Sequence, residues 1–199
     1  MVIKNIIRSV LVIVISTAVF GFGYPAVMVG FAQAAFPSQA NGSLLYHNGQ
    51  VVGSALAAQD FTGAQYFHER PSATTPAYNA ASTTFANYGP TSATLAANVK
   101  QQAEAILKLE GPYNPGLKIG DIPVDAVTTS GSGIDPDISI AYAQLQSRRV
   151  AAVRHLPLAT VDGLISQYTT ERSIGILGDP GVNVLELNLA LNRIAKGTK

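Results

Sequence analysis

Two serines in a glycine turn are the residues whose types and spacing come closest to chemistry. Ser130 and Ser132 alternate with Gly131 and Gly133, just before a run with helical periodicity. A glycine turn at a helix N-terminus presents free backbone N–H groups, which can bind a phosphate. However, there is no G-x-x-x-x-G-K-[ST] motif and no lysine nearby, and acidic residues follow the turn where the anion would sit. We therefore interpret the segment as a structural turn.

Other catalytic and metal-binding patterns are absent from the sequence. A serine nucleophile needs a base and an oxyanion hole, but the turn lacks the G-x-S-x-G pattern and no histidine is near it in sequence. The three histidines, His47, His68 and His155, do not have the spacing of metal ligands. The chain has no cysteine, which excludes disulfides and thiol chemistry. We expect no catalytic residue, no metal site and no cofactor on this chain.

The residues around the turn predict a strand before it and a helix after it. Val124–Thr129 is rich in Val and Thr and follows a proline, which favours a strand. Asp135 suits a helix N-cap, Pro136 suits the first helical position, and Asp137 complements the positive end of the helix dipole. Apolar residues at helical spacing are expected to form one face of this helix: Ile138, Ala141, Tyr142, Leu145, Ala152 and Val153. Three arginines are expected near its C-terminus: Arg148, Arg149 and Arg154.

The N-terminal segment predicts one helix that spans a membrane. The run Val10–Phe36 has no charged residue and exceeds the ~20 residues that a spanning helix needs. Ala32–Ala34 reads A-Q-A, as at a signal-peptidase site, but the apolar core of a signal peptide is only ~7–15 residues long. We therefore favour a retained anchor over a cleaved signal. Lys4 and Arg8 precede the run, which predicts a cytoplasmic N-terminus and an extracytoplasmic remainder.

Composition bounds the rest of the chain. We expect a cytoplasmic tip with a transmembrane helix over residues 1–36 and one extracytoplasmic domain over residues 37–199, long enough to enclose a core. Charged residues make up 13% of the chain, against roughly 25% in ordinary soluble domains. A surface covered by partner subunits would be low in charge, and so would one selected for an unusual exterior; composition does not separate the two. The net charge of +1 gives no indication of a nucleic-acid partner.

The segments before the glycine turn predict a hairpin, a long loop and a helix. Asn48-Gly49 between two apolar runs is a strong hairpin signal. Asp60–Pro90 has little periodicity but several aromatic residues, so it is expected to be an ordered loop that either docks a partner or is pinned to its own core. Thr94–Leu109 has helical periodicity.

Two further helices are predicted after the central one. Thr160 is expected to cap a short helix. Asp179-Pro180 repeats the Asp-Pro pair, and the run Val182–Leu191 that follows fits both a strand alternation and a helical stripe. We favour a helix because of the Asp-Pro start and the many helix-forming residues. The expected fold class is α+β, with a single N-terminal transmembrane helix followed by one extracytoplasmic α+β domain.

In this order, these pieces closely resemble the C subunit of the Kdp potassium-transporting ATPase, a bacterial high-affinity potassium pump. The resemblance rests on the anchor and on six motifs: Y-F-H-E-R-P-S-A (66–73), Y-N-A (78–80), G-P-T (89–91), P-V-D-A-V-T-T-S-G-S-G-I-D-P-D-I-S (123–139), R-V-A (149–151) and V-N-V-L-E-L-N-L-A-L (182–191). The sequence departs from the family's usual residues over Ser82–Tyr88 and at Asp137, Ile140 and Gly181.

The resemblance implies an accessory, non-catalytic subunit of a membrane complex. Its partners would be a channel-like potassium-binding subunit and a P-type ATPase subunit, which would handle the potassium and the ATP. The resemblance also implies help with ATP binding, which can only be indirect if the domain is extracytoplasmic. The motif positions that would serve structure or partner contact are Arg70, Pro71, Ser72, Asn79, Ser130, Gly131, Ser132, Gly133, Asp135, Pro136 and Asn183.

Two other classes of function remain as alternatives. One is a membrane-anchored exported hydrolase that uses Ser130 or Ser132, which would need a base and an oxyanion hole from distant residues. The other is a free-standing extracytoplasmic binding domain. A stoichiometric complex in mild detergent would favour the pump subunit over both.

Overall fold

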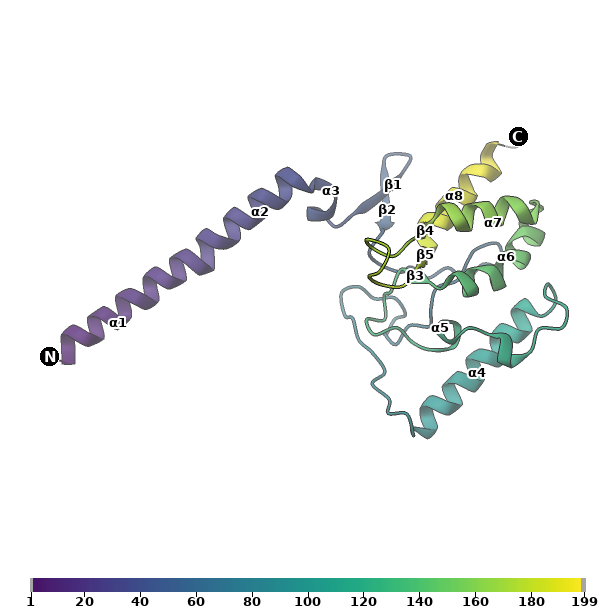
Figure 1. The fold of residues 1–199 in the computed structure, drawn as a ribbon, viewed down its shortest axis with the longest axis horizontal. Coiled ribbons are helices and arrows are strands. Elements are labelled where there is room, and N and C mark those ends of the chain that lie inside the picture. The colour runs from purple at the N-terminus through teal and green to yellow at the C-terminus, as the bar shows by residue number, and fades with distance from the viewer. Residues whose placement is uncertain (1, 198–199) are drawn as a thin grey trace. The chain divides into compact units, whose positions relative to one another are not determined.

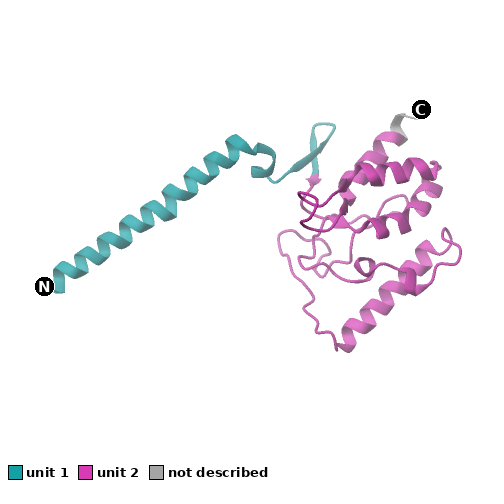
Figure 2. Cartoon of the chain, viewed as in Figure 1, with its two compact units in different colours: residues 1–52 teal, residues 53–199 magenta. Residues whose placement is uncertain are grey.

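The structure is a computed structural model in which residues 2–197 are described, with side chains described as far as residue 194. The chain forms two compact units, Met1–Val52 and Gly53–Lys199, which are coloured separately in Figure 2.

The first unit is dominated by one long apolar helix. Helix α1 (Val2–Ser16), a π-helical segment η1 (Thr17–Gly23) and α2 (Tyr24–Ala35) form a continuous 34-residue helix that contains an 18-residue stretch with a mean hydropathy of 2.1. At 1.5 Å per residue it is about 50 Å long, well beyond the ~30 Å hydrocarbon core of a bilayer. It is the one helix in residues 2–197 that is long and apolar enough to span a membrane, as predicted.

The π-helical segment lies beside a proline. Pro25 has no N–H to donate and its ring crowds the preceding turn. The chain accommodates this by widening the turn, so that the Tyr24 N–H donates to the Val19 carbonyl, five residues back. A short helix, α3 (Pro37–Ala40), follows.

The predicted hairpin is confirmed. Strands β1 (Leu44–His47) and β2 (Gln50–Ser54) are joined by a two-residue turn. Asn48 has a φ of 51° and Gly49 a φ of 78°, both positive as a type I′ turn requires.

The second unit mixes helices with a small sheet, which confirms the α+β class. Figure 1 shows the irregular chain after β2 running along one side of this unit to α4. The elements are α4 (Ala93–Glu110), the 3₁₀ turn η2 (Ile119–Asp121), α5 (Val124–Val127), β3 (Asp137–Ile138), α6 (Ile140–Arg154), α7 (Leu158–Gln167), β4 (Thr169–Thr170), β5 (Gly181–Asn183) and α8 (Val184–Gly197).

The sheet brings together the starts of the two core helices. Its order is β3-β5-β4, with both pairings antiparallel. Asp137 pairs with Asn183 and Ile138 with Val182, so the segments that lead into α6 and α8 lie side by side. Fully buried apolar side chains fill the space beneath: Phe67, Ala143, Val150, Val161, Val182, Val184, Leu187 and Leu191.

Two predictions around the glycine turn are wrong. Val124–Thr129 begins with a helical turn, α5, because its residues connect locally: the Thr128 hydroxyl donates to the Val124 carbonyl at 2.7 Å. Asp135-Pro136 does not start a helix, because the next two residues pair with β5 as a strand. The N-cap of α6 is Ser139, whose hydroxyl accepts from the Tyr142 N–H.

The second Asp-Pro pair behaves in the same way. Asp179-Pro180 leads into β5, and α8 begins only at Val184, so the predicted helix is present but starts later. Helix α7 begins at Leu158, two residues before the predicted cap at Thr160. The helix predicted over Thr94–Leu109 is confirmed as α4, with Ser92 as its N-cap.

Candidate functional site

The structure brings the R-P-S-A segment against the S-G-S-G-I-D-P segment, a packing that we call the loop–loop contact (Arg70–Asn79 against Ser130–Pro136). An Arg70 guanidinium nitrogen lies 2.9 Å from a carboxylate oxygen of Asp135. The Ser72 hydroxyl donates to the Gly133 carbonyl at 2.7 Å. Two segments sixty residues apart in sequence are thereby joined by one charged and one neutral hydrogen bond.

Within the glycine turn, the serine hydroxyls bind the turn's own backbone. The Ser130 hydroxyl accepts from the Gly133 N–H at 2.8 Å, and the Ser132 hydroxyl accepts from the Ile134 N–H at 3.2 Å. Asp135 accepts from the Asp137 N–H at 3.2 Å. The N–H groups of Gly133, Ile134 and Asp137 are therefore already paired, which supports the structural interpretation of the turn.

Gly133 is the glycine that the contact requires. Its φ is +74°, in the left-handed region. A Cβ here would lie 2.6 Å from the Thr74 Cγ2 and 2.8 Å from the Thr84 carbonyl oxygen. Only glycine fits both the backbone conformation and the close approach of the other loop.

Asn183 joins this region to helix α8. Its amide nitrogen donates to the Ala55 carbonyl at 2.9 Å and to a carboxylate oxygen of Asp137 at 3.3 Å. Its amide oxygen accepts from the Glu186 N–H at 3.1 Å, as an N-cap does. The Pro136 carbonyl accepts from the Val184 N–H at 3.1 Å, so the glycine turn and the start of α8 are bonded together.

The remaining predicted positions lie near the contact without joining its two segments directly. The Asn79 N–H donates to the Thr74 hydroxyl at 3.0 Å and its side chain accepts from the Ala81 N–H, both within its own loop. Gly131 and Ser132 are exposed. Pro71 lies at the wall of two surface cavities.

A buried ion pair was missed by sequence reasoning. Arg149, predicted to lie near the end of the central helix, is fully buried on α6. Its Nε donates to Glu110 of α4 at 2.8 Å, and its Nη1 donates to the carbonyls of Ala64 and Tyr66. On a helical wheel it looks like one of three arginines, and no local signal marks it as the buried one.

Two buried amides hold the backbone of the same loop. The Asn188 side chain on α8 accepts from the Phe67 N–H and donates to the Phe67 carbonyl, both at 2.9 Å. The Gln146 side chain on α6 accepts from the His68 N–H at 2.7 Å and donates to the His68 carbonyl at 3.1 Å. Each amide replaces the neighbouring strand that this extended backbone would otherwise need.

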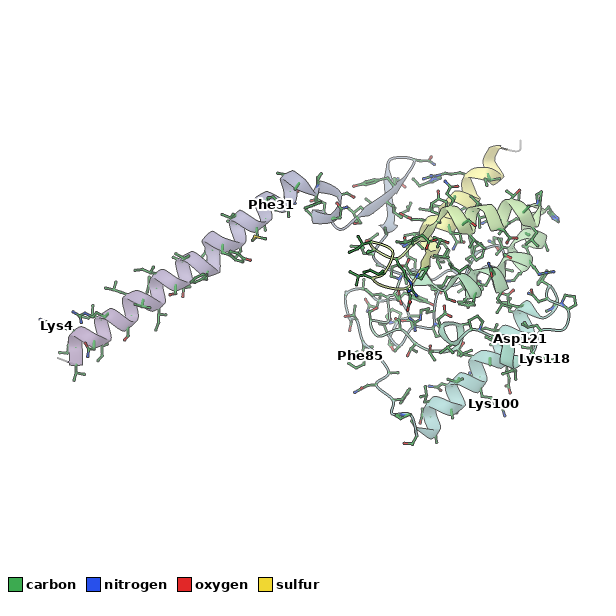
Figure 3. The ribbon with its side chains drawn as sticks, in the orientation of Figure 1. Lys4, Phe31, Phe85, Lys100, Lys118 and Asp121 are labelled. Carbon is green, nitrogen blue, oxygen red and sulfur yellow. The ribbon has the colours of Figure 1, made fainter. Side chains whose placement is uncertain are left out.

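The long aromatic loop therefore divides into two parts. Phe67 is in the core, and Tyr66 packs under Arg154, whose guanidinium carbon lies 5.0 Å from the ring centroid. Phe85 and Tyr88, in contrast, are 58% and 44% exposed, and Figure 3 shows Phe85 at the outer edge of the unit. The first part is pinned to its own core, and only the second remains a candidate docking surface.

Burial shifts the pKa values of several groups behind the first part of the loop. Burial raises the pKa of Glu69 to about 9, with smaller contributions from Asp135 and Asp137. Burial lowers the pKa of His68, and the Arg149 charge lowers it further. His68 is therefore neutral at pH 7, and its Nε2 lies 3.1 Å from the Gly63 carbonyl oxygen. Among the described residues, no group of three or more His, Cys, Asp or Glu side chains is arranged to hold a metal ion.

Comparison with known proteins matches both the helix and the domain. A family model described as "K+-transporting ATPase, c chain" matches residues 6–193. The chain belongs to the KdpC family.

Individual KdpC relatives agree over nearly their full length. A potassium-transporting ATPase KdpC subunit from Acidobacterium capsulatum is 48% identical over 96% of this chain and 99% of its own. The KdpC subunit of Paraburkholderia phytofirmans is 48% identical over 98% of this chain and 100% of its own. That of Gemmatimonas aurantiaca is 50% identical over 88% of this chain and 85% of its own.

Membership of the KdpC family makes this chain a subunit of the potassium-transporting ATPase. The resemblance stated from the motifs is therefore confirmed. The single N-terminal apolar helix fits a single-pass membrane protein within that complex.

Proposed function

We propose that this chain is an accessory, non-catalytic subunit that stabilises the assembly of a potassium-binding subunit and a P-type ATPase subunit. Potassium and ATP would be bound by those partners, and this chain would act through contact alone. Any help with ATP binding would be indirect, through the anchor helix.

The observation that carries the proposal is the uncovered apolar helix. Within Val2–Ala35 almost every side chain is exposed, including large ones such as Phe20, Phe22 and Phe31. Figure 3 labels Lys4 and Phe31 near its opposite ends. A surface this long and apolar needs lipid or other transmembrane helices around it.

Two exposed apolar groups on the second unit support docking outside the membrane. Phe85 and Tyr88 form one. The other is a tight turn in which Ile174, Ile176 and Leu177 are exposed, closed by the bridge between Ser173 and Leu177. Exposed aromatic and aliphatic anchors of this kind are typical of protein interfaces.

The charges at the N-terminus support an extracytoplasmic domain. Lys4 and Arg8 precede the apolar run, and the next basic residue along the chain is Arg70. This bias favours a cytoplasmic N-terminus at the inner membrane. The domain would then lie on the opposite side of the membrane from the cytoplasmic ATP.

The absence of cysteine makes orientation directly testable. Two single variants, Ser9→Cys and Glu104→Cys, are each treated with a membrane-impermeant maleimide in intact spheroplasts. We expect Glu104→Cys to be labelled at once and Ser9→Cys only after the membrane is broken. The reverse pattern would contradict the proposed topology.

Assembly is tested by a double substitution on the exposed part of the aromatic loop. We expect Phe85→Ser with Tyr88→Ser to leave the domain folded but to reduce its co-purification with the other pump subunits at least several-fold. Ile119→Ser, an exposed apolar position on η2, is the control. If the double variant assembles like the control, this part of the loop is not the docking surface.

The hydrolase alternative gains no support from the geometry. Both serine hydroxyls accept hydrogen bonds from the turn that carries them.

A further inference from the structure

A surface cavity of about 420 Å³ lies behind the aromatic loop, within the second unit. One wall is formed by residues of the Asp60–Tyr78 segment and the other by α4, with Tyr142 of α6 also contributing. Its walls mix polar residues with apolar and aromatic ones, the latter including Phe61, Ala105, Ile106, Leu109, Ala126 and Tyr142. None of the residues that line it has a role in the proposed docking surfaces.

Glu69 is the unusual group in this cavity. Glu69 is only 4% exposed, and neither of its carboxylate oxygens has a hydrogen-bond partner of good geometry among the described residues. The Gln59 backbone lowers the pKa of Glu69 in part, against the larger effect of burial. Burying a carboxyl without partners is costly, so such a group indicates a missing donor.

The charged neighbours of Glu69 do not supply that donor. Arg70, the next residue, turns its guanidinium to Asp135, and its buried Nε has no hydrogen-bond partner among the described residues. Glu110, which also lines the cavity, has one oxygen bonded to Arg149 and the other, Oε2, without a partner. The Tyr78 hydroxyl donates to the Arg70 carbonyl, 3.1 Å away.

We propose that this cavity binds an ammonium or guanidinium group on a short alkyl chain, with Glu69 as its counter-ion. The cation would donate to the unpartnered oxygens of Glu69, and its alkyl chain would lie against the apolar residues of the walls. A bare metal ion fits less well, because it would fill a small part of the volume and would meet few oxygens. The group comes either from a free amine or from a lysine or arginine of a partner subunit, and both sources present the same chemistry.

The proposal predicts how binding depends on pH. Glu69 is protonated in the free protein at neutral pH, because burial and the charges of Asp135 and Asp137 raise its pKa. An alkylammonium or alkylguanidinium probe keeps its own charge throughout this range, so its binding must displace the proton of Glu69. The affinity should rise towards tenfold for each pH unit between about pH 6 and pH 8.

The test uses the full chain in detergent, titrated with butylammonium or ethylguanidinium chloride and followed by calorimetry and thermal unfolding. We expect saturable binding that Glu69→Gln weakens at least tenfold. Glu104→Gln, which removes the same charge from the exposed face of α4, should bind like the unmodified chain. Ala105→Phe, an exposed position at the cavity wall, should block binding without altering Glu69.

Three results would overturn the proposal: no saturable binding to the unmodified chain, equal binding to Glu69→Gln, or equal competition by potassium chloride at the same ionic strength. A second experiment distinguishes the two sources. If the probe binds the free chain but is excluded from the assembled pump, a partner side chain occupies the cavity. If it binds both, the ligand is a free amine.

Discussion

Two ion pairs in the second unit use the same chemistry in different surroundings. Arg149 and Glu110 have side chains that are 0% and 2% exposed, whereas those of Arg70 and Asp135 are 24% and 30% exposed. The first joins two helices and the backbone of a loop in the core. The second joins two loops where water still screens the charges.

The comparison shows that the residues most easily recognised in the sequence are not those that contribute most to the free energy of folding. Arg70 and Asp135 lie in the segments that make the KdpC resemblance obvious, yet a partly exposed pair contributes little free energy. Arg149 belongs to a short R-V-A motif with no apparent chemistry. Because removing one partner would leave the other charge buried and unpaired, Arg149 should matter far more to folding.

The largest effect is expected at the buried pair. Arg149→Met should lower the free energy of unfolding of the second unit by about 3–5 kcal/mol, because it leaves Glu110 buried without a partner and frees the loop carbonyls of Ala64 and Tyr66. Urea unfolding followed by circular dichroism measures this. Adding Glu110→Gln should recover part of the loss, and a loss below about 1 kcal/mol would show that the pair is not a major support of the fold.

Glu69, a buried carboxyl without a partner, extends the comparison between buried and partly exposed charges. Burial raises the pKa of Glu69 from 4.5 to about 9, so the folded protein holds the proton of this carboxyl more tightly than the unfolded chain does. The stability that this gives is fully present below pH 4.5 and is lost as the pH rises towards 9. Glu69→Gln cannot ionise, so relative to the unmodified chain it should become more stable with rising pH, by roughly 2 kcal/mol or more at pH 8. Parallel stability curves for the two proteins between pH 5 and pH 9 would contradict this.

A smaller effect is expected at the partly exposed pair. Asp135→Ala should cost about 1–2 kcal/mol, through loss of the Arg70 ion pair and of the hydrogen bond from the Asp137 N–H. In a double-mutant cycle with Arg70→Ala, the coupling energy should be about 1 kcal/mol or less and should fall with added salt. A salt-independent coupling above about 3 kcal/mol would mean that this pair is effectively buried.

The smallest effect is expected at an exposed turn hydroxyl. Ser132→Ala loses one exposed 3.2 Å hydrogen bond to the Ile134 N–H and should change stability by about 0.5 kcal/mol or less. The comparison variant is Ser130→Ala, in which a buried hydroxyl is lost and the Gly133 N–H is left unpaired, so the cost should be about 1–2 kcal/mol. Equal effects at the two serines would show that their difference in burial does not matter.

Local signals predicted the elements that depend on local chemistry. The Asn48-Gly49 turn, the helix after Ser92 and the long apolar anchor each follow from residues that lie next to one another in sequence. The chain also showed its family directly through its motifs, which the comparisons confirmed.

Long-range pairing explains what the sequence could not predict. Asp135-Pro136 looks like a helix start until Asp137 is seen to pair with Asn183, forty-six residues away. In the same way, Arg149 is buried because Glu110 of α4 and the Ala64–Tyr66 backbone meet it, and none of these is near it in sequence. The aromatic loop is ordered by Gln146 and Asn188, whose amides have no distinctive sequence signal.

The most direct test of action by contact is the rate of potassium-stimulated ATP hydrolysis per assembled pump, measured at saturating ATP with Asp135→Ala and with Ser132→Ala. We expect Asp135→Ala to lower the yield of complex in step with its lost stability, and both variants to turn over within about twofold of the unmodified pump once assembled. A fully assembled, stoichiometric complex that had lost tenfold or more of its turnover through either change would contradict a purely structural role for these residues.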